Sequence, residues 1–84
     1  MTRLLEISDP ITMEIDDQGL PVRFVWKTRM HPVEHISKRW RVDLGWWRIQ
    51  IWREHYKLTT RTGLLVIVYR DLLTGQWFLQ RLYD

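Results

Sequence analysis

The chain has 84 residues, of which 45% are hydrophobic and 27% charged, a composition typical of one small globular domain and not of a disordered tail. It contains no cysteine, which excludes disulfides, thiol catalysis and cysteine-ligated metal sites and fits a cytoplasmic location. The net charge of +3 is unevenly spread, since residues 1–17 carry −4, residues 18–61 carry +7 and residues 62–84 are neutral. The basic middle segment suits a polyanionic partner, or simply solvates the outer faces of strands.

Residues 1–10 are expected to form a flexible tail before a single domain over residues 11–84. They lack the apolar stretch of a signal peptide, and no segment of the chain has the roughly 20 apolar residues that span a bilayer, so no membrane partner is expected. Apolar residues then alternate over Ile11–Ile15 and again over Val22–Trp26, with a turn at Gly19 between them. This pattern predicts a hairpin.

The next segment is less regular. Residues 27–30 predict a second turn, although they contain no glycine, and residues 43–45 predict a loop. Between them, residues 33–42 alternate imperfectly, because Val33 does not share the parity of the later apolar residues. A strand is favoured over residues 32–40, and a helix starting at Pro32 is the alternative.

The second half of the chain predicts a three-stranded meander. After an ambiguous stretch over residues 46–52, alternation returns at Tyr56 and continues through two glycine turns to Tyr83. Leu64–Tyr69 is apolar at every position, which is typical of a central strand covered on both sides. The predicted fold is mainly β: a small antiparallel barrel or strongly curled sheet of five to six strands, with at most one short helix.

Several short motifs resemble a bacterial domain-of-unknown-function family. They are the Trp46-Trp47 pair, the Gly19-Leu20-Pro21-Val22 opening, and the closing Gly75-Gln76-Trp77 turn with its terminal Tyr83-Asp84. That family occurs as short stand-alone proteins and as the C-terminal module of Y-family-polymerase-like mutagenesis proteins. The resemblance covers about residues 11–84 and implies an accessory role in DNA damage tolerance. It supplies no catalytic residues.

No constellation in the sequence predicts catalysis, a metal or another cofactor. His31 and His35 are four residues apart, which would suit a zinc site on a helix but separates them by about 13 Å on a strand. Together with His55, they are interpreted as surface or rim residues. The two serines lie outside any nucleophile-elbow pattern, and the glycines are spaced as turn residues rather than as a phosphate loop. The protein is therefore predicted not to be an enzyme.

Basic residues interleaved with tryptophans are the remaining candidate site. Trp26, Trp40 and Trp77 fall on predicted core faces, whereas adjacent tryptophans on an extended chain point to opposite sides, so one of the pair at 46 and 47 is expected to be exposed. We expect one binding face between positions 23 and 53. Its candidate residues are Arg23, Lys27, Arg29, Lys38, Arg39, Arg41, Trp46, Trp47, Arg48, Trp52 and Arg53.

Two functions follow from this pattern. Tryptophan and arginine are enriched at the hot spots of protein interfaces, which favours a non-catalytic module that recruits or stabilises repair or polymerase proteins. Cations that follow phosphates beside rings that stack on bases are typical of single-stranded nucleic-acid binding, so DNA is the alternative partner. The sequence leaves the partner, the oligomeric state and the exposed member of the tryptophan pair open.

Overall fold

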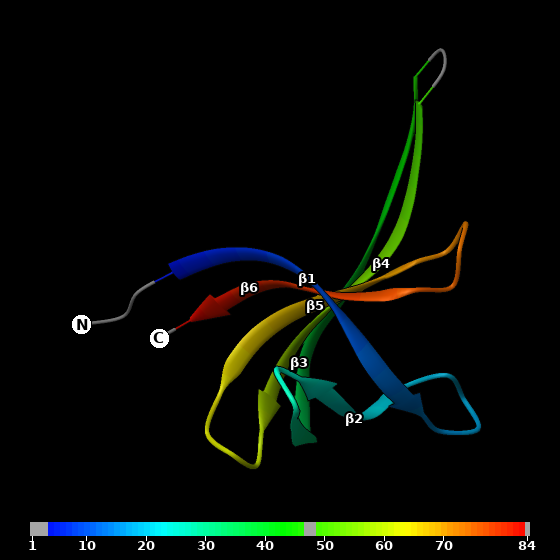
Figure 1. The fold of residues 1–84 in the computed structure, drawn as a ribbon. Helices are drawn as coiled ribbons and strands as arrows, with labels where there is room; N and C mark the ends of the chain where they lie inside the picture. Colours follow the sequence, from blue (N-terminus) through cyan, green and yellow to red (C-terminus); the bar gives the residue numbers. More distant parts are fainter. Residues whose placement is uncertain (1–3, 47–48, 84) are drawn as a thin grey trace.

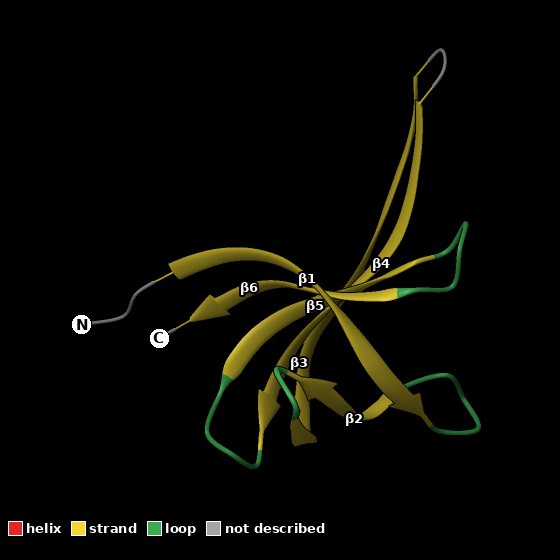
Figure 2. Ribbon diagram, in the orientation of Figure 1, coloured by secondary structure: helices red, strands yellow, loops and turns green. Residues whose placement is uncertain are grey.

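Within residues 4–46 and 49–83, six antiparallel strands, each hydrogen-bonded to the next, close into a barrel when β6 returns to β1 (Figures 1 and 2). This arrangement is seen in a computed structural model, which describes those two ranges of the chain. No helix occurs within these residues, so the predicted small antiparallel barrel is confirmed. The strands are β1 (Leu4–Ile15), β2 (Pro21–Trp26), β3 (Arg29–Trp46), β4 (Ile49–Thr60), β5 (Leu65–Asp71) and β6 (Trp77–Tyr83).

Two long strands, β1 and β3, each take part in two ladders. β1 pairs with β6 through Ile11 and with β2 from Thr12 onward. β3 pairs with β2 over Arg29–Pro32 and with β4 over the rest of its length. We expected residues 1–10 to be a tail, but β1 begins at Leu4 and its first half completes the barrel against β6.

The far ends of β3 and β4 project from the barrel as a two-stranded ribbon (Figure 1). The β4–β5 ladder spans Arg53 to Thr59, and residues 49–52 of β4 pair with β3, with one more hydrogen bond from Leu72 N–H to the Trp52 carbonyl at 2.9 Å. We call residues 43–46 and 49–52 the arm. The loop predicted at residues 43–45 is therefore wrong, because β3 runs through these positions to Trp46.

The barrel interior is filled by one apolar cluster. It is built on alternate residues of β4, β5 and β6, with Phe24 of β2 completing it. Its buried members are Phe24, Tyr56, Leu58, Val66, Val68, Trp77 and Leu79. This confirms the predicted meander over Tyr56–Tyr83 and the predicted core position of Trp77. β5 is buried on both faces from Val66 to Tyr69, as its unbroken apolar run predicts.

Two β-bulges explain the irregular pattern of residues 33–42. The β3–β4 register slips between Val33 and His35 and again between Ile36 and Lys38. Each extra residue reverses which face the following side chains occupy. Val33 and Ile36 therefore both pack against the core, while Trp40 lies on the outer face. The strand prediction is confirmed, and the core prediction for Trp40 is wrong because the second bulge moves it outside.

The β2–β3 turn explains how a hairpin forms without glycine. Trp26 pairs with Arg29 across a two-residue loop, and both loop residues have positive φ, 51° at Lys27 and 64° at Thr28. Two-residue hairpin loops favour this left-handed pair because its twist matches that of the flanking strands. A β-branched residue fits the conformation poorly, so Thr28 carries backbone strain.

We expect Thr28→Gly to raise the free energy of unfolding by about 0.5–1 kcal/mol, because relief of the left-handed strain exceeds the added entropy of the unfolded chain. Urea unfolding followed by tryptophan fluorescence measures the change. Gln18→Gly is the control: it also adds a glycine to an exposed turn, but at a residue without positive φ. That variant should be slightly destabilised. Equal effects of the two substitutions would contradict strain at Thr28.

Candidate binding surface

The β3–β4 ribbon has two faces, and the predicted binding residues are divided between them. From Lys38 onward the ladder is regular, so alternate residues share a face. One face continues the barrel interior, and we call it the inner face. The opposite face is the outer face. Arg39, Arg41 and Trp52 lie on the inner face, and Lys38 and Arg53 lie on the outer face. The single basic face expected over residues 23–53 is therefore not formed.

On the inner face, two arginines hold one glutamate. Arg39 Nε donates to Glu54 Oε1 at 2.5 Å, and Arg41 donates to Glu54 Oε2 through Nε at 3.1 Å and Nη2 at 2.9 Å. The Glu54 side chain is only 8% exposed, whereas those of Arg39 and Arg41 are 53% and 55% exposed. Burial raises the pKa of Glu54, but the hydrogen bonds from Arg39 and Arg41 outweigh it and leave the pKa below its usual range.

A third arginine extends this cluster toward the barrel mouth. Arg70 is the cross-strand neighbour of Glu54 on β5, and its guanidinium lies 5.9 Å from the Trp77 ring. Trp77 in turn stacks on Tyr56 at 5.5 Å. Arg70 Nε is buried and has no hydrogen-bond partner in the described part of the chain. The inner face near Glu54 thus carries three arginines, Arg39, Arg41 and Arg70, beside the two carboxylates of Glu54 and Asp43.

On the outer face, four rings stand in one row across four strands. Trp40 stacks on His55 at 5.2 Å, His55 contacts Tyr69 at 5.3 Å, and Tyr69 stacks on Phe78 at 5.1 Å. Each pair consists of direct cross-strand neighbours. Because the rings lie against one another, His55 and Tyr69 are buried. This row acts as a second, smaller core on the outside of the barrel.

Cations cover the ring faces of this row. Lys38 Nζ lies 5.3 Å from the Trp40 ring, and the Arg53 guanidinium lies 4.4 Å from the Tyr69 ring. Such contacts stabilise the cation and ring by about 0.5–1 kcal/mol at exposed sites. A nucleic-acid base would have to displace these cations before it could stack on the row.

The environment of His55 favours its neutral form. Burial lowers the pKa of His55, and the charge of Arg53 lowers it further, while a hydrogen bond with Gln80 acts in the opposite direction. His55 Nδ1 is itself buried without a hydrogen-bond partner among residues 8–45 and 50–83. His55 is therefore a packed ring between two aromatic neighbours, and interpreting it as a surface residue was wrong.

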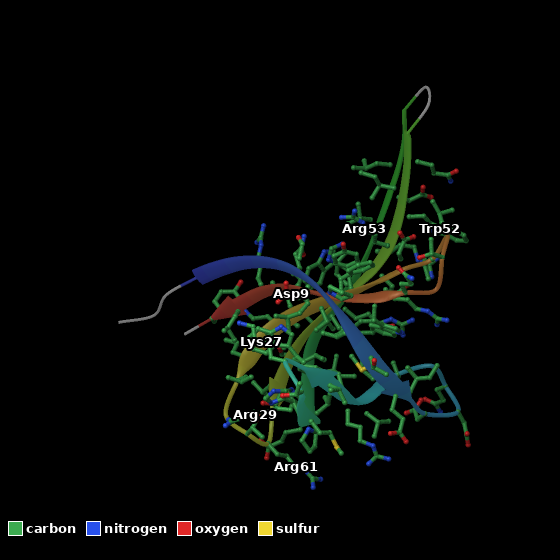
Figure 3. All side chains as sticks on the ribbon, in the orientation of Figure 1. Asp9, Lys27, Arg29, Trp52, Arg53 and Arg61 are labelled. Carbon is green, nitrogen blue, oxygen red and sulfur yellow. The ribbon has the colours of Figure 1, made fainter. Side chains whose placement is uncertain are left out.

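The remaining basic candidates lie far from the arm. Lys27 lies in the β2–β3 turn and Arg29 is the first residue of β3, whereas the arm is at the other end of β3. Figure 3 shows Lys27 and Arg29 at the opposite end of the molecule from Trp52 and Arg53. Lys27 Nζ lies 5.0 Å from the half-buried Trp26, which donates its Nε1 hydrogen to Asp9 at 3.0 Å.

Arg23, on β2, is occupied by an ion pair. It binds Glu14 of β1 through two nitrogens, and the hydrogen bond lowers the pKa of Glu14 and raises that of Arg23. Trp52 is half-buried on the inner face of the arm. The side chains of Trp46, Trp47 and Arg48 lie outside the described part, and so does the prediction that one of these tryptophans is exposed.

The three histidines are dispersed. His31 and His35 lie on one strand, β3, and His31 faces inward, where its Nδ1 is 2.8 Å from the Thr62 hydroxyl oxygen. Burial lowers the pKa of His31, with a smaller effect of the nearby Arg29 charge. His35 is exposed, but His31 is buried, so the surface interpretation of His31 was also wrong. Within the residues that the structure describes, no three histidine or carboxylate side chains come together to hold a metal.

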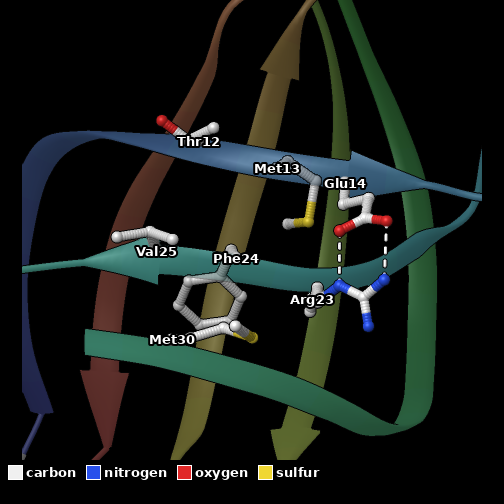
Figure 4. Close-up of a pocket in the computed structure, with 7 residues that line it drawn as sticks. All are labelled: Thr12, Met13, Glu14, Arg23, Phe24, Val25 and Met30. Carbon is white, nitrogen blue, oxygen red and sulfur yellow. Dashed lines mark hydrogen bonds and ion pairs between the residues drawn. The ribbon is translucent and has the colours of Figure 1, made fainter. Parts of the chain in front are cut away.

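A shallow groove lies along β1, β2 and the start of β3 (Figure 4). Its volume is about 300 Å³, and the Glu14–Arg23 ion pair borders it. The lining is otherwise mostly apolar and offers no paired titratable groups. The lining residues are Thr12, Met13, Glu14, Arg23, Phe24, Val25 and Met30.

Comparison of the chain with models of known protein families, with curated proteins and with solved structures found no match. The family resemblance therefore rests on the sequence motifs alone. In the described residues, no helix has the length and apolar character needed to cross a membrane.

Proposed function

We propose that this protein is a non-catalytic interaction module, which binds another protein through the arm and the basic residues at its base. The observation that carries the proposal is the projection of the arm beyond the barrel. Residues 43–46 and 49–52 form a ladder with each other, with one further backbone hydrogen bond from Leu72 N–H to the Trp52 carbonyl. The described side chains of this segment, those of residues 43–45 and 50–52, are not part of the core cluster. A small domain gains little stability from such an extension, so we assign the arm to binding.

The side chains of the arm and its base suit a protein interface. On the outer face, Leu44 is 58% exposed beside its cross-strand partner Ile51, which is half-buried, and on the inner face Trp52 is half-buried. At the base of the arm, Arg39 and Arg41 expose guanidinium groups that Glu54 already holds in place. Exposed apolar groups next to ordered arginines are the usual composition of binding hot spots, because little side-chain entropy remains to be lost.

The family resemblance supplies the setting of the proposal. It makes repair and polymerase proteins of DNA damage tolerance the first partners to test, in a cytoplasmic location that the absence of cysteine favours.

Single-stranded nucleic acid is the second candidate. It is favoured by three arginines on the inner face, since Arg39 and Arg41 bind Glu54 and Arg70 lies over Trp77, and these outnumber the carboxylates of Glu54 and Asp43. Such a cluster could hold phosphates, and binding would then weaken steeply as salt is added.

The test compares two triple variants in affinity capture from cells exposed to DNA damage. Lys38→Ala, Arg39→Ala and Arg41→Ala together remove three charges at the base of the arm. Lys27→Ala, Arg29→Ala and Arg61→Ala remove three exposed charges at the opposite end of the barrel. We expect the wild type and the second variant to capture the same partner, and the first variant to capture at least about tenfold less, because truncated interface arginines often cost 2 kcal/mol or more.

Nuclease treatment and an oligonucleotide titration separate the two candidates. If capture survives nuclease and a short mixed-sequence oligonucleotide shows no anisotropy change up to roughly 100 μM at about 50 mM salt, nucleic acid is excluded, since non-specific binders reach that affinity. If instead capture depends on nucleic acid and the oligonucleotide binds, the protein-interaction proposal is wrong. Equal loss of capture in both triple variants would also contradict the arm as the site.

A further inference from the structure

One edge of β3 is open along the base of the arm. From Val33 onward β3 pairs with β4 on one side, while no strand in the described ranges 4–46 and 49–83 pairs with its other side. β2 is too short to cover this edge, because its ladder with β3 ends at Pro32. The backbone donors and acceptors on that side of β3 are therefore available to an additional strand.

The side chains beside this open edge alternate in chemistry. Over residues 38–44, Arg39, Arg41 and Asp43 lie on the inner face, and Lys38, Trp40, Val42 and Leu44 lie on the outer face. The two arginines are two residues apart, which on a strand is roughly 6.6 Å. An extended peptide has the same spacing between residues j and j+2. A strand added at this edge would thus present one set of alternate side chains to the arginines and the other set to the apolar row.

The arginines are ordered but not saturated. Glu54 accepts hydrogen bonds from Arg39 Nε and from Arg41 Nε and Nη2, and each guanidinium has five donor hydrogens. The terminal nitrogens of Arg39 make no hydrogen bond to Glu54 in this arrangement. Since both side chains are more than half exposed, each can bind a further carboxylate beside the strand.

We propose that the open edge of β3 over residues 38–44 binds an extended segment of a partner protein in which acidic and apolar residues alternate. The acidic residues pair with Arg39 and Arg41, the apolar residues cover Trp40, Val42 and Leu44, and the backbone adds a strand to the sheet. This inference rests on the proposed function and specifies its partner. It commits to an acidic protein segment, and a polynucleotide or a second copy of this chain becomes an outcome of the test.

The first experiment uses synthetic peptides of nine residues. One alternates glutamate with valine, and a second has the same residues in two blocks. A fluorescent label on each reports binding to the full chain by anisotropy at about 150 mM salt. We expect the block peptide to bind at least tenfold more weakly, because it cannot place carboxylates and methyl groups on opposite faces of one strand.

Backbone methylation tests the added strand directly. Two further alternating peptides carry N-methyl groups on either the odd or the even amides. Successive N–H groups of a strand point to opposite sides, so only one set faces β3. We expect one methylated peptide to lose at least about tenfold in affinity and the other to keep most of it. Equal affinities of the two methylated peptides would overturn strand addition, whether or not any protein variant folds.

Protein variants test the role of the arginines. The double variant Arg39→Gln with Arg41→Gln should bind the glutamate–valine peptide at least tenfold more weakly than the wild type does. Its affinity for a peptide with glutamine in place of glutamate should be nearly unchanged. Lys27→Gln with Arg29→Gln is the matched control at the other end of β3 and should bind both peptides as the wild type does. A nuclear magnetic resonance amide spectrum of each variant shows whether the barrel is intact.

The remaining outcomes separate this inference from the proposed function. If every peptide fails while a protein partner is still captured through the arm, the edge proposal is wrong and the interaction module stands. If an oligonucleotide competes with the peptide and binds more tightly, the edge proposal and the protein-interaction proposal are both wrong. If sedimentation of the free protein shows a dimer that excludes the peptide, the occupant is a second copy and the proposal is overturned.

Discussion

Replacing Trp77 by alanine is expected to lower the free energy of unfolding by about 3–5 kcal/mol. Trp77 is only 7% exposed, stacks on Tyr56 at 5.5 Å and lies under the Arg70 guanidinium. Truncation removes the ring from the cluster and leaves a cavity that a barrel of six strands cannot collapse to fill. Since domains of this size are often only 5–10 kcal/mol stable, the variant should be largely unfolded at mild urea concentrations.

Two further substitutions make this result interpretable. Trp77→Phe keeps an aromatic ring and should lose less stability than Trp77→Ala. Leu73→Ala removes a large apolar side chain that is 54% exposed in the β5–β6 turn, and it should change stability by less than about 0.5 kcal/mol. All three are compared by urea unfolding monitored by circular dichroism. A Trp77→Ala protein that melts within a few degrees of the wild type would show that the core is not centred on this ring.

The second half of the fold could be predicted because its local signals agree. Tyr56–Tyr83 alternates cleanly, carries glycines where the turns need positive φ, and has one strand apolar on both faces. Each of these signals depends only on residues close together in the sequence, so it predicts a strand or a turn without knowledge of the partner strands. The same holds for the predicted hairpin of Ile11–Trp26, which the β1–β2 ladder confirms.

Most errors fall on β3 and come from two features of its pairing, the bulges and the cross-strand ladder of the arm. Two bulges at Glu34 and Ser37 reverse its faces, and nothing local in the sequence marks a position where one strand has an extra residue. The bulges moved Trp40 from the predicted core to the outer face. Gly45 suggested a loop, but the cross-strand pairing of the arm keeps it extended. Pairing of this kind depends on residues far along the chain.

The candidate site could be predicted in composition but not in geometry. The sequence identifies Lys38, Arg39, Arg41 and Arg53 as a basic segment, and all four lie on the β3–β4 ladder near the base of the arm. Alternation along a strand then places neighbours on opposite faces, which divides the set. Sequence analysis missed Glu54 and Arg70, although Glu54 holds the two arginines. The register that brings residues 41, 54 and 70 into one row is a property of the closed sheet.

The same long-range pairing connects the barrel to its proposed function. β3 has 18 residues, three times as many as β2, so it cannot be covered along its whole length by β2 and one of its edges remains open. Charged residues on such an edge usually prevent uncontrolled association. In the edge-binding proposal, Arg39 and Arg41 discourage apolar strands and favour acidic ones. The same two arginines would thus keep the free protein soluble and select acidic partner strands over apolar ones.

Acidification is expected to destabilise the protein through two buried histidines before its carboxylates contribute. The folded-state pKa values of His31 and His55 lie below the ordinary value of 6.5, mainly because both rings are buried. As the pH falls below 6.5, the unfolded chain binds protons that the folded chain does not, so stability declines. The carboxylates of Glu14 and Glu54, whose pKa values are lowered, act only below about pH 4.5.

We therefore expect the melting temperature to fall between pH 7.5 and pH 5 by on the order of 5 °C, equivalent to about 1 kcal/mol for a domain of this size. Thermal unfolding followed by circular dichroism measures it. His31→Asn and His55→Phe should each reduce the pH dependence, and the double variant should nearly abolish it between pH 7.5 and 5, whatever its absolute stability. His35→Gln is the control, because that side chain is exposed and the pH dependence should persist. A double variant that keeps the full pH dependence would show that other groups govern the acid response.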